Sequence, residues 1–262
     1  MSLISPASAA ESAHGGIHVA LAPYVVGHVF GVPITSTLIT AWLGMVILTI
    51  IAVLVRRHLA LVPGKLQSVM EMMIGGVYDY MADVLESRQL ARKYFPIVMT
   101  IFIFILTLNW FGLFPGVTSI GYYAGHGEES HFIPFLYPSA TDLNITLAFA
   151  LIAFFTIQFS GIAAIGAFKY AGKFINFSSP LNFAVGIIEL ISEIARLISF
   201  SFRLFGNIFA GKTLLVVVMF FVPYFVPVPI MAFEVFVGFI QAFVFAILTL
   251  FFIKIATEEP AH

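Results

Sequence analysis

ELISEIARLISFSFRLFGNIFAGK, the stretch Glu189–Lys212, is long enough and apolar enough to cross a lipid bilayer, yet it carries several charged and amide side chains. These polar residues are Glu189, Glu193, Arg196, Arg203, Asn207 and Lys212. At about 100° per residue, all of them except Lys212 fall on one helical stripe roughly 80° wide. An ionised side chain at the bilayer centre costs about 2.5–3.5 kcal/mol on insertion scales. We therefore expect the stripe to face protein or water rather than lipid, and to carry a function.

The composition places the chain among proteins that cross a membrane several times. Of its 262 residues, 61% are hydrophobic and 10% are charged, whereas soluble domains carry about 25% charged residues. The net charge of −1 provides no basic surface, so no nucleic-acid partner is expected. There is no cysteine and no phosphate-binding, nucleophile or zinc motif, so we expect no cofactor, no metal and no catalytic residue. The first residues, MSLISPASAAESAHGG, do not have the pattern of a signal peptide.

The apolar runs predict an all-α fold with about five membrane-spanning helices. The expected spans are 37–55, 95–114, 143–167, 181–218 and 231–255. Residues 65–86 are too charged to cross, and their apolar residues recur at helical spacing, which predicts an amphipathic helix at the membrane interface. We find no internal repeat or linker, so residues 37–262 are expected to form a single transmembrane domain. Residues 1–36 are expected to be an outer tail, with room for a surface helix, and residues 116–141 a loop.

The basic residues predict how the spans are oriented. Nine of the twelve lie in 56–94, at Lys169 and Lys173, and at Lys254, which five spans would place on one side of the membrane. The other three lie inside the fourth span. Because basic segments stay on the cytoplasmic side, we expect the N-terminus outside and the C-terminus in the cytoplasm.

The fourth span is too long for an upright helix. Its 39 residues from Pro180 to Val218 would measure about 58 Å as one helix, against a hydrocarbon core of about 30 Å. A continuous helix would lie tilted well beyond the usual ~20°, and the sequence leaves open whether the helix is continuous. The Pro-rich turn VPYFVPVPI (222–230) is short, so the fifth helix is expected to run antiparallel beside the fourth.

Arg203, near the middle of the fourth helix, is a permanent cation, because a guanidinium keeps its proton at any working pH. It cannot relay protons by titrating, but it can attract a carboxylate and repel a proton. Glu189 and Glu193 lie toward the inner side of it, Asn207, Lys212 and Glu234 lie toward the outer side, and Gln241 lies deeper on the same face as Glu234. A carboxyl group removed from water can take up and release protons near neutral pH. This layout predicts two half-channels separated by a cation.

Purely structural interpretations of the same residues are open as well. Glu193 and Arg196 are three residues apart and could pair on the helix surface. Arg203 could form an interhelical salt bridge, although it lies too far from either helix end to reach water. Glu234 could be a packing residue. The amides Asn109, Asn144 and Gln158 are typical of hydrogen bonds between helices. A surface metal site of His126, His131, Glu128 and Glu129 is less expected than simple solvation of that loop.

Several motifs resemble those of the a subunit of F-type ATP synthases, the stator beside a rotating ring of c subunits. The clearest are SFRLFGNIFAGKTLL (201–215) and FIQAFVFAILTLFFI (239–253). Weaker matches, in the order of the family, are FIFILTLNWFGLFP (102–115), YPSATDLNITLA (137–148) and PLNFAVGIIELIS (180–192). The resemblance covers most of the chain after residue 95. It implies that the last two helices lie strongly tilted and antiparallel against the c-ring.

The resemblance also implies residue roles. Arg203 corresponds to the arginine that faces the ring carboxylate, Asn207 to the asparagine one turn further on, and Gln241 to the glutamine opposite the arginine. The implied outer path includes Glu234, Asn109, Asp142 and Asn144, and the implied inner path includes Glu189, with Arg196 where the family often has a basic residue and Glu193 beside it. Lys212 departs from the family, which often has Glu or His there, and could either pair with Glu234 or be desolvated. Gly112 replaces an acid seen in some members.

The function implied by the resemblance is proton translocation. Two offset half-channels, separated by Arg203, would couple proton flow to rotation of the ring, while the chain itself would not catalyse ATP formation. The implied partners are the c-ring, b-type peripheral stalk subunits, the rest of the ATP synthase and membrane lipid, in a bacterial inner membrane. The rival interpretation is a self-contained ion channel or secondary transporter, although the repeats and broken helices of transporters are not evident here. A structural scaffold would leave the polar stripe unexplained.

Overall fold

The computed structural model describes residues 23–57, 64–114, 116–124, 131–174 and 180–258. Five of its helices are long and apolar enough to cross a membrane, which confirms the expected all-α polytopic fold. They are α1 (Ser36–Arg57), α3 (Arg88–Phe111), α4 (Leu143–Ile165), α6 (Pro180–Phe221) and α7 (Pro227–Thr257). The two last helices are the longest, as the sequence predicts.

Two shorter helices accompany these spans. α2 (Lys65–Val84) lies where an amphipathic helix is expected, and its Met81 belongs to one apolar cluster with Leu250 and Ile253 of α7. α5 (Ala167–Phe174) was not predicted, since Lys169 and Lys173 were expected only to close the third span. The chain leaves α4 at Gly166, whose φ of +91° belongs to the region that favours glycine. The third span therefore ends before residue 167.

Several helix ends differ from the predicted bounds. α3 begins at Arg88 rather than at residue 95, because the Ser87 hydroxyl accepts a hydrogen bond from the Leu90 amide at 3.3 Å and caps the helix. Pro96 consequently lies inside α3. α6 and α7 extend beyond the expected 181–218 and 231–255, so the turn between them shortens to residues 222–226.

Two short β-hairpins correct the expectation of a tail and a plain loop. β1 (Val25–Val29) pairs antiparallel with β2 (Val32–Thr35) through Phe30 and Gly31, which both have positive φ, as tight hairpin turns require. β3 (Gly121–Ala124) pairs antiparallel with β4 (His131–Pro134), between the short 3-10 helices η1 (Val117–Ser119) and η3 (Ser139–Thr141). The Tyr122 hydroxyl donates to the Val26 carbonyl at 3.2 Å and joins the hairpins. Residues 1–22 and the loop residues His126, Glu128 and Glu129 lie outside the described residues.

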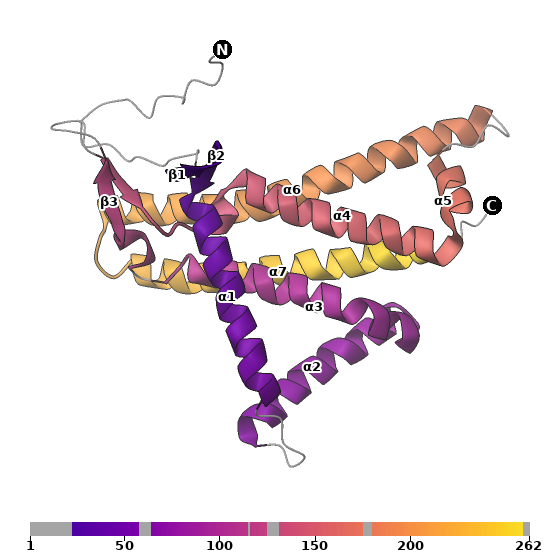
Figure 1. Ribbon diagram of the computed structural model, residues 1–262, viewed down its shortest axis with the longest axis horizontal. Coiled ribbons are helices and arrows are strands. Elements are labelled where there is room, and N and C mark those ends of the chain that lie inside the picture. Colours follow the sequence, from indigo (N-terminus) through magenta and orange to yellow (C-terminus); the bar gives the residue numbers. More distant parts are fainter. Residues whose placement is uncertain (1–22, 58–63, 115, 125–130, 175–179, 259–262) are drawn as a thin grey trace.

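The helices α3, α4, α6 and α7 lie side by side, and α1 runs at a large angle to them (Figure 1). α6 is one continuous helix of 42 residues, which answers the question that the sequence left open, and α7 returns antiparallel beside it. Ala153 of α4 and Ala242 of α7 are 0% exposed in the core, next to Leu108 of α3 and Leu204 of α6. Such small residues let membrane helices approach closely.

Candidate functional site

The polar stripe of α6 has different surroundings along its length. At the end near α5, Glu193 is buried with 4% of its surface exposed. Further along the same stripe, Asn207 is exposed. The stripe is therefore covered at Glu193 and open at Asn207, and the helices packed against α6 decide which polar groups are accessible.

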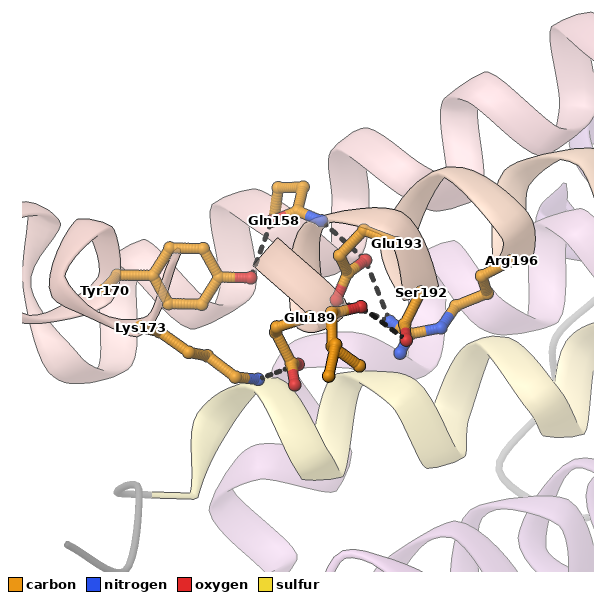
Figure 2. Close-up of polar contacts among 8 residues, drawn as sticks. Gln158, Tyr170, Lys173, Glu189, Ser192, Glu193 and Arg196 are labelled. Atoms are coloured by element: carbon orange, nitrogen blue, oxygen red, sulfur yellow. Dashed lines mark hydrogen bonds and ion pairs between the residues drawn. The ribbon is translucent and has the colours of Figure 1, made fainter. Parts of the chain in front are cut away.

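A hydrogen-bond network covers the α5 end (Figure 2). The Glu193 carboxylate accepts hydrogen bonds from Gln158 of α4 at 2.9 Å and from the Arg196 guanidinium at 2.8 and 2.9 Å. The Tyr170 hydroxyl of α5 donates to the Gln158 side-chain oxygen at 2.6 Å. Burial, and next the charge of Glu193, raise the pKa of Tyr170 to about 12, so its hydroxyl keeps the proton that it donates. The pairing of Glu193 with Arg196 is thus observed, although the carboxylate is buried rather than on the surface.

Glu189, one turn earlier on α6, belongs to a more open part of the same end. Its carboxylate oxygen lies 2.8 Å from the Lys173 ammonium of α5, and the two side chains are 30% and 21% exposed (Figure 2). An ion pair with this exposure contributes little to stability, about 0–1 kcal/mol. The pair of Lys173 and Glu189 therefore adds little to the stability of the fold.

Arg203 has only a weak attachment within the chain. One guanidinium nitrogen donates to the Ser199 hydroxyl at 3.1 Å, while the other terminal nitrogen is buried and has no partner among the described residues. No carboxylate in the described part of the chain forms an ion pair with it. The interhelical salt bridge considered for Arg203 is therefore absent from these residues. Gln241 lies half-buried on α7, the helix that packs along α6.

Glu234 and Lys212 lie near the α6–α7 turn. The Glu234 carboxylate is 4% exposed, and it lies directly against the backbone of Gly211, where even a single Cβ atom would collide with it. The Lys212 ammonium nitrogen is buried 3.2 Å from the centre of the Tyr137 ring. Among the described ion pairs there is none between Lys212 and Glu234, so the pairing that the sequence left open is not observed.

Asn109 joins α3 to α7. Its side-chain nitrogen donates to the Gly238 carbonyl at 2.9 Å, and the neighbouring Trp110 indole donates to the Val235 carbonyl at 3.0 Å. These contacts agree with an interhelical role for Asn109. Its side-chain oxygen is nevertheless buried and has no partner among the described residues, so it can still accept a hydrogen bond from another group.

Asp142 caps α4 and ties it to α1. Its carboxylate accepts hydrogen bonds from the Asn144 backbone N–H at 2.9 Å and from the Thr37 hydroxyl at 2.7 Å, and Asp142 is 4% exposed. Asn144 itself is exposed. Asp142 thus has two partners that hold it in place, whereas the Asn144 side chain faces outward.

The structure does not gather the predicted residues into one cluster. It divides them into the network near α5, the middle of α6 with the half-buried Arg203 and the exposed Asn207, and the Glu234–Lys212 region near the α6–α7 turn. Asn109 and Asp142 form their own contacts between helices. Three residues that contact these groups were not predicted from the sequence, namely Tyr137, Tyr170 and Ser199. Only Ser199 had a signal, its position one helical turn before Arg203.

Comparison with known proteins shows similarity along most of the chain. A family model described as ATP synthase A chain matches residues 38–254. ATP synthase subunit a of Moorella thermoacetica is 33% identical over 231 residues, which cover 88% of this chain and 94% of that protein. ATP synthase subunit a of Campylobacter curvus is 35% identical over 217 residues, 83% of this chain and 88% of that protein. ATP synthase subunit a of Campylobacter jejuni is 36% identical over 220 residues, which cover 82% of this chain and 88% of that protein. With its apolar helices, the chain therefore belongs to the family of the a subunit of F-type ATP synthases, integral membrane components of the complex that links proton transport to ATP synthesis.

Proposed function

We propose that this chain carries protons to and from the carboxylates of a c-ring through two half-channels, with Arg203 as the barrier between them. The observation that carries the proposal is the state of Arg203. It is a permanent cation within a span, and among the described residues it has no carboxylate partner and one of its terminal nitrogens has no hydrogen bond. A carboxylate supplied by a partner would satisfy it.

The two half-channels use the polar groups on either side of this arginine. The outer path passes Glu234, with Asn109, Asp142 and Asn144 beside it, and the inner path passes Glu189, with Glu193 and Arg196 beside it. Asn207 and Gln241 lie next to the barrier on α6 and α7. The weakly held, partly exposed Glu189 supports an inner exit, because a proton acceptor there has access to water.

Arg203 gives the direction of transfer a physical basis. A ring carboxyl that has taken up a proton from the outer path is neutral and can face lipid, where a charged group is costly. When it returns to Arg203, the guanidinium stabilises the ionised form, and the proton leaves by the inner path. One charge moved through 100 mV corresponds to about 2.3 kcal/mol, so a leak past Arg203 would uncouple the complex.

The shape of the molecule supports contact with a curved ring. α1 runs at a large angle to α6 and α7 (Figure 1), so these helices lie strongly tilted when α1 stands upright in the bilayer. At 42 residues, α6 measures about 63 Å, twice the hydrocarbon thickness of about 30 Å. We propose that this tilted pair faces the c-ring, with b-type stalk subunits as further partners. The N-terminus then lies outside a bacterial inner membrane and the C-terminus in the cytoplasm.

In this proposal the chain is a channel subunit and makes no ATP itself. The rival function, a self-contained channel or transporter, predicts a chain that purifies alone or as a homo-oligomer after mild detergent extraction. A stator subunit is expected to stay with a ring of small membrane subunits and a soluble ATPase.

The test is ATP-driven acidification of inverted membrane vesicles with Arg203→Ala and the matched control Ser199→Ala. Ser199→Ala removes the observed hydrogen-bond partner of the guanidinium but keeps its charge. We expect Arg203→Ala to abolish pumping in a complex that still assembles, as judged by immunoblot, and Ser199→Ala to pump within about threefold of wild type, the effect of one hydrogen bond. Normal pumping by an assembled Arg203→Ala complex would contradict the proposal.

A further inference from the structure

Lys212 and the Glu234 side chain occupy neighbouring positions on α6, but they do not form an ion pair with each other. The Glu234 carboxylate lies against Gly211, and Lys212 is the next residue along the helix. Successive helix positions differ by about 100°, so the lysine leaves α6 on an adjacent face. Its side-chain nitrogen is buried, and among the described residues it has neither a hydrogen-bond partner nor a carboxylate partner. The described residues therefore offer Lys212 no acidic partner.

The Tyr137 ring is the group that contacts the ammonium. The Lys212 nitrogen lies 3.2 Å from the ring centroid, inside the range of about 6 Å in which aromatic rings attract cations. Burial, followed by the effect of Tyr24, raises the pKa of Tyr137 to about 12. The phenol is therefore neutral at working pH, so the ring face rather than a phenolate attracts the lysine.

Three neighbours fix the position of this ring. The Tyr137 backbone amide donates to the Thr40 hydroxyl of α1 at 3.0 Å, and the Tyr24 ring packs edge-on against it at 5.3 Å between centroids. The next residue, Pro138, lies so close to Gly112 at the end of α3 that a Cβ there would be 2.7 Å from the proline Cβ. The aromatic face is thus held between the N-terminal segment, α1 and α3.

We propose that Tyr137 is a positioning residue that holds the Lys212 ammonium away from Glu234 and so leaves the Glu234 carboxyl free to exchange protons. An ammonium paired with that carboxylate would favour its charged form and oppose proton uptake. The lysine stem is long and flexible enough to turn toward the neighbouring carboxylate when the ring no longer holds it. This inference rests on the proposed role of Glu234 in the outer path.

A double-mutant cycle in the intact complex tests the inference by ATP-driven acidification of inverted vesicles. Tyr137→Met, which removes the ring and keeps a bulky apolar side chain, is expected to lower the initial rate about tenfold, because a neighbouring cation changes the protonated fraction of a carboxyl group by at least that factor. Tyr137→Phe keeps the aromatic face and is expected to stay within about twofold of wild type. In a Lys212→Met background, Tyr137→Met is expected to lower the rate by less than about twofold, because no cation is left to misplace.

Two other outcomes overturn the inference. An equal effect of Tyr137→Met with and without Lys212 would show that the ring only supports packing. Loss of pumping in Lys212→Met itself would show that the ammonium takes part in transport rather than being held aside. If Tyr137→Met complexes do not assemble, Thr40→Val, which removes the acceptor of the Tyr137 amide, provides the same cycle. If the predicted coupling between Tyr137 and Lys212 is not found but assembled Arg203→Ala complexes do not pump, only the role of Tyr137 is excluded. If assembled Arg203→Ala complexes pump normally, the proposed function itself is excluded.

Discussion

Replacing Arg196 by Met is expected to destabilise the chain strongly, because it leaves a buried carboxylate without its cation. Glu193 is 4% exposed, and both of its oxygens accept hydrogen bonds from Arg196. Removing one partner of such a buried pair costs about 3–5 kcal/mol. The guanidinium also lies 3.8 Å from the centre of the Phe252 ring, a contact that adds about 0.5–2 kcal/mol. The sum is a large part of the typical stability of about 5–15 kcal/mol.

Two matched variants separate the buried charge from other effects of the substitution. The double change Glu193→Gln with Arg196→Met leaves no charge to bury, and replacing both members of a buried pair is often neutral or stabilising by about 1–4 kcal/mol. It is therefore expected to recover most of the lost stability. Lys173→Met removes a cation from the partly exposed pair with Glu189 and is expected to cost only about 0–1 kcal/mol.

The measurement is the fraction of the chain that stays in the intact complex after detergent extraction over a series of temperatures. Arg196→Met is expected to dissociate at a much lower temperature than wild type, and the double variant close to wild type. If Arg196→Met were as heat-resistant as wild type, the carboxylate would have to be neutral or solvated. Arg196 would then not be needed to compensate a buried charge on Glu193.

Three further changes are expected to have distinct effects. Gly211→Ala should displace the buried carboxylate of α7 and lower ATP-driven pumping about a hundredfold in an assembled complex, whereas Gly75→Ala, whose Cβ meets nothing within 4 Å, should pump normally. Asp142→Ala should cost about 1–2 kcal/mol in thermal stability, because α4 loses its cap and an α1 hydroxyl loses its acceptor. A hydrogen bond from Lys254, and next its charge, hold the pKa of Glu86 below its ordinary value of 4.5. The ion pair therefore stabilises the folded chain above pH 4.5, and this stabilisation is lost as the pH falls through the pKa of Glu86 in the folded state. Hydrogen-exchange protection of the α2–α3 turn should therefore decrease below about pH 4.5, and Glu86→Gln should show no such decrease.

The sequence predicted the large elements of the fold because bilayer thickness sets the length of an apolar span. The five long helices and the amphipathic α2 follow from this constraint and from helical periodicity. Bilayer thickness does not constrain the shorter elements, so they were not predicted. The hairpins have strands of only four or five residues, and the first turns at Phe30-Gly31 rather than at an Asn-Gly or Asp-Gly pair. α5 has eight residues and follows a glycine, so hydropathy alone could not separate it from the preceding span.

The candidate site was predictable in its residue types but not in its contacts. One helical stripe contained both Glu193 and Asn207, yet α4 covers the first and leaves the second exposed. Helical geometry describes one helix at a time, whereas the neighbours of a side chain depend on helices far away in the sequence. Gln158 and Tyr137 are examples, since the former bonds Glu193 from α4 and the latter contacts Lys212 from a connecting segment.

The distribution of unsatisfied polar atoms distinguishes the stabilising part of this polar system from the part that needs other groups. Four buried side-chain atoms of the described residues lack a partner, and they belong to Tyr94, Asn109, Arg203 and Lys212. Three of these residues are among those that the sequence assigned to proton transfer, although buried polar atoms are rarely left unpaired. The buried carboxylate near α5, in contrast, has all its hydrogen bonds within the chain. A network that only stabilises a fold can complete itself, whereas a proton path must leave donors and acceptors for water and for a partner's carboxylate. Under the proposed function, coupling therefore depends most on Arg203 and Glu234, whereas the pairing of Glu193 with Arg196 and Gln158 mainly holds α4 and α6 together.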